Sequence, residues 1–69
     1  MKSLIDFVQR QIDRVAADPD TRFLLTEGFC IPEVNTNNHS ASQLLPVLEH
    51  FRANGYPKTR VTSRGLTIA

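Results

Sequence analysis

A basic segment near the C-terminus has the clearest chemistry in this sequence. No acidic residue follows Glu49, and residues 50–69 carry a net charge of +4 with neutral histidines. The candidate partner-binding residues of this segment are Arg52, Tyr56, Lys58, Arg60 and Arg64. Cations that surround an aromatic ring are typical of nucleic-acid-binding surfaces, and a basic face also attracts acidic protein surfaces. The segment therefore predicts an anionic partner.

The remainder of the chain has the opposite sign. Residues 1–49 hold four basic and seven acidic residues, a net charge of −3, although the whole chain has a net charge of only +1. Such an asymmetry predicts that the basic end meets either an external anionic partner or the acidic half of a second copy.

Metal binding and covalent catalysis have weak support. A metal site would have to combine Cys30, His39 and His50 with Glu33 or Glu49. No two of these have the spacing of metal ligands, and adjacent positions on a helix point about 100° apart. No nucleophile elbow or redox motif surrounds Cys30, so we expect it to be a buried, apolar side chain. The sequence predicts no enzyme, no metal site and no cofactor.

The length of 69 residues predicts a single small domain, residues 1–69, with a thin stability margin. A chain of this size buries only roughly 60% of the surface that its unfolded form exposes. It is also too short to wall off a substrate pocket of roughly 300 Å³ or more. Cys30 cannot form a disulfide within the chain, so we expect a homodimer to supply the missing burial.

The cellular compartment is predicted from the single cysteine and from the lack of a signal-peptide core or a membrane-spanning run. A lone cysteine is typical of a reducing compartment. Charged residues from Asp6 to Arg14 interrupt any signal-peptide core, and no run approaches the roughly 20 apolar residues that span a bilayer. We therefore expect a cytoplasmic protein with no membrane partner.

Local signals predict three helices, at residues 3–17, 19–27 and 43–54. Ser3 is a suitable N-cap for the first, which ends before Pro19. Asp18 and Pro19 favour the start of the second, and Gly28 its end. The third has two possible starts: Ser40 has capping-box spacing, but Pro46 then requires either a kink or a later start. The Gly55-Tyr56 pair should end this helix, with Tyr56 packed on Phe51.

The remaining segments read as a loop and a β-hairpin. Residues 30–41 combine proline with asparagines, which predicts an ordered loop pinned by Ile31 and Val34, with a brief extended piece possible. After Pro57 the apolar residues alternate, which predicts a short hairpin or a single strand within residues 58–69. Ser63-Arg64-Gly65 fits a three-residue hairpin loop with glycine at the left-handed position.

These elements predict an α+β fold: a small, mostly helical domain of three helices with a short C-terminal β-hairpin or strand. Leu44, Leu45, Val47, Leu48 and Phe51 should supply the buried face of the third helix. The expected core is Leu4, Phe7, Val8, Ile12, Val15, Phe23, Leu24, Phe29, Val47, Leu48, Phe51 and Val61.

Two functions stay open. A helix followed by a basic hairpin resembles a winged-helix module over the last third of the chain, which implies nucleic-acid binding. A helix-turn-helix, however, needs a turn of three to four residues, and the gap from Gly28 to about Ser42 is far longer. The favoured function is a non-enzymatic regulator or inhibitor that binds a protein partner through helix 3–17 and the basic segment. In size and composition the chain is similar to small phage or plasmid regulators that inhibit a host protein.

Overall fold

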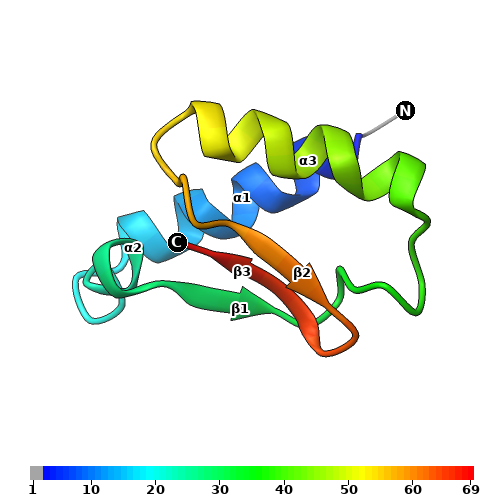
Figure 1. Cartoon of the computed structure of the whole chain (residues 1–69). Helices are drawn as coiled ribbons and strands as arrows, with labels where there is room; N and C mark the ends of the chain where they lie inside the picture. Colours follow the sequence, from blue (N-terminus) through cyan, green and yellow to red (C-terminus); the bar gives the residue numbers. More distant parts are fainter. Residues whose placement is uncertain (1–2) are drawn as a thin grey trace.

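The fold is a three-stranded antiparallel sheet with helices packed on one of its faces. The computed structural model describes residues 3–69, and its element order confirms the predicted α+β class. Figure 1 shows the two longer helices running side by side in the same general direction above the sheet. The elements are α1 (Leu4–Ala17), α2 (Leu24–Glu27), β1 (Phe29–Ile31), α3 (Ala41–Ala53), β2 (Arg60–Thr62) and β3 (Gly65–Ile68).

The sheet joins the predicted hairpin to the brief extended piece. Its strand order is β1-β3-β2, so the last strand in the chain lies in the centre. Leu66 of β3 stands between Ile31 of β1 and Val61 of β2, and all three belong to or pack against one apolar core. The hairpin loop contains two residues rather than the predicted three, because Gly65 already pairs with Thr62. The positive φ expected of Gly65 is present, at 149°.

The opposite face of the sheet is not covered by the helices. Cys30, Thr67 and Arg60 form one row across the three strands, in register between the inward-facing residues. Side chains alternate between the two faces of a strand, so Cys30 faces away from the core because its neighbours Phe29 and Ile31 face toward it. The expectation of a buried Cys30 is therefore wrong: its side chain is exposed.

Gly65 lets β1 and β3 approach each other. A Cβ atom built at Gly65 would lie 2.7 Å from the Sγ of Cys30 and 2.8 Å from the carbonyl oxygen of Ile31. Both distances are shorter than van der Waals contact, so no residue with a side chain fits there without moving the strands.

The core draws on every layer of the fold. Its buried apolar residues are Val8, Ile12, Ile31, Val34, Leu44, Val47, Leu48, Phe51, Leu66 and Ile68. The core predicted from the sequence is only partly correct. Of its members, Leu4, Phe7, Val15, Leu24, Phe29 and Val61 are half-buried. Phe23 is wrong, since it is 55% exposed. The core list omitted Ile31, Val34 and Leu44, although the first two were expected to pin the loop and Leu44 to lie on the buried face of the third helix; all three are buried. Leu66 and Ile68 were not predicted, because their burial depends on β1 pairing with β3.

Residues 18–23 form turns instead of the first part of the predicted helix 19–27. The side chain of Asp18 accepts a hydrogen bond from the Asp20 N–H at 2.9 Å, as a capping residue would. The Thr21 hydroxyl, however, donates to the Val15 carbonyl at 3.1 Å, and Nε of Arg22 donates to the Ala16 carbonyl at 3.3 Å. These bonds satisfy carbonyls at the end of α1 and fold the segment back on it. Only Leu24–Glu27 is helical, and the predicted stop at Gly28 is confirmed by its φ of 99°.

Helix α3 begins two residues earlier than predicted and continues through Pro46. The Gln43 side chain accepts a hydrogen bond from the Ser40 N–H at 2.8 Å, so the cap fixes the start at Ala41. The predicted end is confirmed: Gly55 has a φ of 103°, and the Tyr56 N–H donates to the Phe51 carbonyl at 3.0 Å. The rings of Phe51 and Tyr56 also meet, with centroids 6.4 Å apart. Within residues 3–69, no helix has the length and apolarity needed to cross a membrane.

Candidate functional site

Two of the predicted partner-binding residues help to hold the connection between α3 and β2. Nε of Arg52 donates to the Thr59 carbonyl at 2.9 Å. Thr59 is fully buried, and its hydroxyl donates to the Tyr56 carbonyl at 2.8 Å. Tyr56 is half-buried against Phe51. Arg52 and Tyr56 therefore have a structural role that limits how far they can move toward a ligand.

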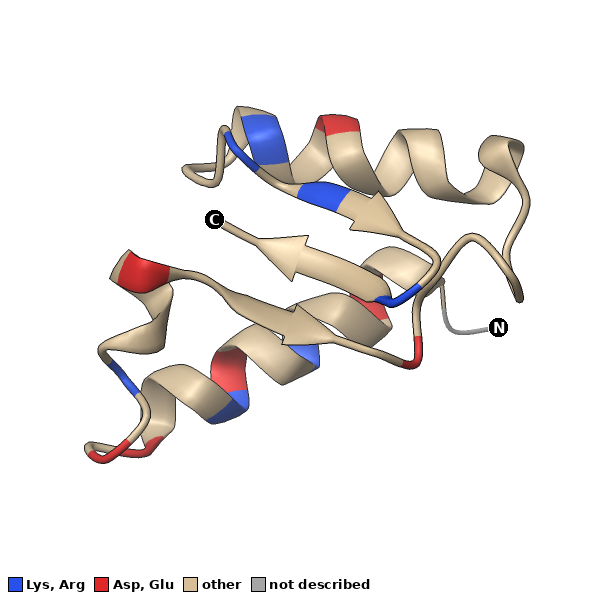
Figure 2. Ribbon diagram, turned by 60° about the horizontal axis from the view of Figure 1, so that its bottom comes forward, with Lys and Arg blue, Asp and Glu red and all other residues tan. Residues whose placement is uncertain are grey.

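The other three predicted residues are exposed, and the fold separates them. Lys58 and Arg60 lie at the start of β2, close to the end of α3, whereas Arg64 lies in the turn at the opposite end of the hairpin. Figure 2 shows basic residues at both ends of β2 and one acidic residue on α3, which is Glu49. The cations line one edge of the sheet and do not converge on one point.

The acidic and basic parts of the sequence also lie on different sides of the structure. In Figure 2 the acidic residues lie mainly on α1, in the turn between α1 and α2, on α2 and just after β1. Arg10, Arg14 and Arg22 lie in the same part of the chain. The β1 side of the molecule is thus mixed in charge and the β2 side mainly basic.

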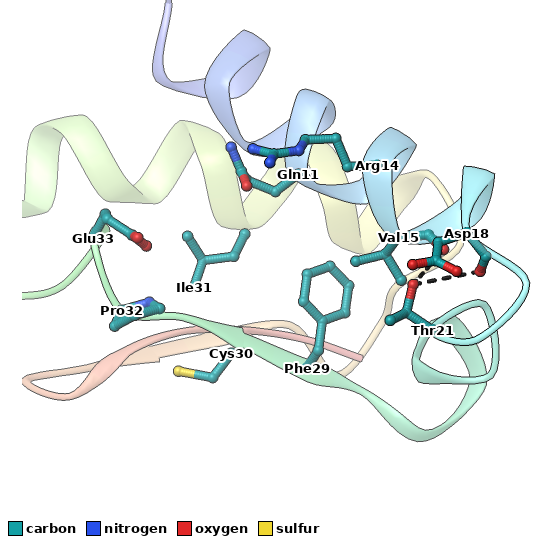
Figure 3. Close-up of a pocket in the computed structure, with 10 residues that line it drawn as sticks. All are labelled: Gln11, Arg14, Val15, Asp18, Thr21, Phe29, Cys30, Ile31, Pro32 and Glu33. Atoms are coloured by element: carbon teal, nitrogen blue, oxygen red, sulfur yellow. Dashed lines mark hydrogen bonds between the residues drawn. The ribbon is translucent and has the colours of Figure 1, made fainter.

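A hollow of about 400 Å³ lies between α1 and β1 (Figure 3). Val15, Phe29 and Ile31 point into it, while the side chain of Cys30 points away from them. The Thr21 hydroxyl at its end is bonded to the backbone of Val15 and Asp18. Neither histidine lines this hollow. Its charged lining residues, Arg14, Asp18 and Glu33, are of both signs.

A larger hollow of about 630 Å³, the α1–α3 groove, lies between the N-terminal halves of the two long helices. Its apolar lining is Leu4, Ile5, Phe7, Pro46 and Val47. Its polar lining is Ser3, Arg10, His39 and Gln43, so among the described residues Arg10 is the one lining residue with a fixed charge. The α1–α3 groove is an apolar surface with a cationic edge.

A third hollow of about 330 Å³, the α3–β2 hollow, lies on the other flank of α3. It is lined by Thr36, His39, Ser40, Ala41, Leu44, Leu45, Leu48 and Val61. Leu45 is 55% exposed, so its predicted burial is wrong. His39 lines both this hollow and the α1–α3 groove, so the two meet around the first turns of α3.

The loop that carries His39 is held by asparagine side chains. Oδ1 of Asn35 accepts hydrogen bonds from the N–H groups of Asn37 and Asn38, at 2.9 and 3.0 Å. Oδ1 of Asn38 contacts Nδ1 of His39 at 2.5 Å. An amide oxygen only accepts, so Nδ1 carries the proton and Nε2 remains for another contact. The loop is thus a fixed wall for both hollows.

Sequence reasoning missed this surface around α3. The signal was present, since 44–48 contains five apolar residues in succession, more than one face of a helix can bury.

No three potential metal-ligating side chains come together in the described part of the chain. Comparison of the chain with known proteins gave no matching family model, no matching curated protein and no matching solved structure.

Proposed function

We propose that this protein is a small, non-enzymatic regulator that acts by binding a protein partner. The observation that carries the proposal is the apolar surface on both flanks of the N-terminal half of α3, with Leu45 55% exposed. The α1–α3 groove and the α3–β2 hollow border this part of the helix. Apolar hollows beside an exposed large apolar residue are typical of protein-binding sites.

The helical positions of α3 support this assignment. Its buried residues, Leu44, Val47, Leu48 and Phe51, form one stripe toward the core. Leu45 and Pro46 lie on either side of that stripe, because successive helical residues are about 100° apart. The apolar surface is therefore wider than the fold requires, and a partner gains by covering the excess.

The basic edge of the sheet has a secondary role in this proposal. Exposed rim charges mainly accelerate association and select between partners, and they add little to affinity. Lys58, Arg60 and Arg64 would then favour a partner with an acidic rim.

An affinity capture from the native host tests the proposal. The wild-type chain should retain one defined protein, and Leu45→Ser should lose it because a polar group then faces the hollow. Gln9→Ala is the matched control, since Gln9 is exposed on α1 outside all three hollows. Capture that is the same for wild type and Leu45→Ser would contradict the proposal.

Nucleic-acid binding is the second candidate, and one observation favours it. Lys58, Arg60 and Arg64 are exposed along one edge of the sheet, and helices do not cover the sheet face that bears Arg60. The winged-helix likeness extends to a helix followed by a hairpin, but residues 28–40 separate α2 from α3 and contain β1. A binder with about four phosphate contacts should show a log-log salt slope near −3 to −4 on duplex DNA. A gel shift on random duplex with that slope, abolished by Arg60→Glu with Arg64→Glu, would reverse the ranking.

A second copy of the chain is the simplest protein partner, and the homodimer remains a prediction. Light scattering at micromolar concentration would then give twice the mass of 7.8 kDa. A monomer of high thermal stability would remove a second copy from the candidates.

A further inference from the structure

We infer that the α1–α3 groove binds an amphipathic helix of the partner whose apolar stripe is flanked by acidic side chains. The inference rests on the proposed function and names the chemistry of the partner. It follows from the shape of the groove, from its apolar lining and from the sign of the charge at its edge.

The shape of the groove fits a helix. α1 and α3 pack together and run in the same general direction (Figure 1), so the surface between them is a long depression between two parallel cylinders. A third helix fills such a depression by inserting side chains at i, i+3, i+4 and i+7. The volume of about 630 Å³ is large enough for several such side chains.

The lining favours apolar anchors. Leu4, Ile5 and Phe7 are half-buried: they pack against the core on one side and line the groove on the other. Below them the groove ends on Val47, which is 1% exposed. An apolar side chain that enters the groove would therefore bury the remaining exposed area of three residues at once.

The charge at the edge selects acidic flanks. Arg10 is exposed, and no carboxylate of residues 3–69 lines the groove. His39 also lines the groove, with Nδ1 held by Asn38. A glutamate or aspartate beside the apolar stripe would meet Arg10, whereas a lysine there would face a like charge. The hollow between α1 and β1 lacks this selectivity, since Asp18 and Glu33 line it together with Arg14.

Two synthetic peptides test the inference by fluorescence polarisation with the full chain. Both carry the same leucine stripe at helical spacing, and they differ only in having glutamates or lysines beside it. We expect the glutamate peptide to bind about fivefold more tightly, the upper end of what one exposed ion pair contributes. Arg10→Glu should remove or invert this preference, Arg10→Lys should keep it, and Phe7→Ala should weaken both peptides.

Arg22→Glu is the matched control for Arg10→Glu. It makes the same change in net charge on an exposed residue, but Arg22 lines none of the three hollows. It should therefore leave the preference for glutamate unchanged within about twofold. An equal effect of the two reversals would mean that the preference arises from net charge alone, and it would overturn the inference.

Three further results would overturn it. One is equal affinity for the two peptides, and another is the absence of saturable binding up to about 1 mM. The third is a wild-type chain with twice the monomer mass in solution, together with a Phe7→Ser variant that has the monomer mass. The groove would then hold a second copy. Failure here while Leu45→Ser still abolishes capture leaves the proposed function standing. Capture that is unaffected by Leu45→Ser contradicts the proposed function itself.

Discussion

Helices α1 and α3 are nearly equal in length, but they distribute their apolar residues differently. They contain 14 and 13 residues, and each turns one stripe toward the core. The outer face of α1 is polar, with Gln9 donating to Asp13 at 3.0 Å. The corresponding surface of α3 carries Leu45 and Pro46, both exposed. A narrow stripe is thus enough to dock a helix in this fold, and the additional apolar residues of α3 are the basis of the proposed partner site.

The largest expected effect on stability comes from truncating the buried residues with which both helices pack on the core. Ile12→Ala and Leu44→Ala truncate residues that are each 4% exposed, one in α1 and one in α3. Each should lower the free energy of unfolding by about 2–5 kcal/mol, through lost burial and the cavity left behind. Urea unfolding followed by circular dichroism measures both. A cost below about 1 kcal/mol for either would show that the helix concerned is not docked as described.

Replacing Pro46 should stabilise the chain. A proline inside a helix lacks the N–H that would bond to the carbonyl four residues earlier, at Ser42, and is about 3 kcal/mol less favourable than alanine. Because Pro46 lies in the interior of α3, we expect Pro46→Ala to raise the free energy of unfolding by about 1–3 kcal/mol.

The same variant should weaken partner binding, since Pro46 lines the α1–α3 groove. Glu49→Ala, exposed on the same helix, is the control and should change stability by less than about 0.5 kcal/mol. A less stable Pro46→Ala would show that the proline serves the fold and not the surface.

The caps of the two helices should have smaller and similar effects. The Ser3 hydroxyl accepts the Asp6 N–H at 3.1 Å, and Gln43 accepts the Ser40 N–H at 2.8 Å. Ser3→Ala and Gln43→Ala should each cost about 1 kcal/mol, measured by thermal unfolding. A negligible loss of stability in Gln43→Ala would show that the Gln43 cap does not determine where α3 begins.

The smallest expected effects on stability come from the outer faces of the two helices, where only the α3 variant should affect partner binding. Leu45→Ala should change the free energy of unfolding by less than about 0.5 kcal/mol, although Leu44→Ala makes the same chemical change one residue earlier. Gln9→Ala on the outer face of α1 should be equally mild. Only Leu45→Ala should also weaken capture of the partner. A large loss of stability at Leu45 would mean that the fold itself uses this surface.

The sequence predicted the features that depend on neighbours a few residues apart. Ser3 begins α1 and Gly28 ends α2 through bonds and φ angles within one turn, and Gly55 with Tyr56 ends α3 in the same way. The hairpin was predicted from alternation and from a glycine that tolerates positive φ. Five of the expected core residues are buried because their spacing placed two of them on one stripe of α1 and three on one stripe of α3.

Only the tertiary structure decided which residues lie at the surface and which surfaces meet. Phe23 and Leu45 have ordinary core chemistry, but the turns of residues 18–23 and the flank of α3 leave them exposed. Cys30 is exposed because β1 pairs with β3, a contact between segments more than thirty residues apart. The hollows beside α3 likewise need α1, β2 and the loop of His39 to come together. Local hydrogen bonds fix where an element begins and ends. Which of its faces is buried depends on packing against segments distant in the sequence, and local sequence patterns do not reveal that packing.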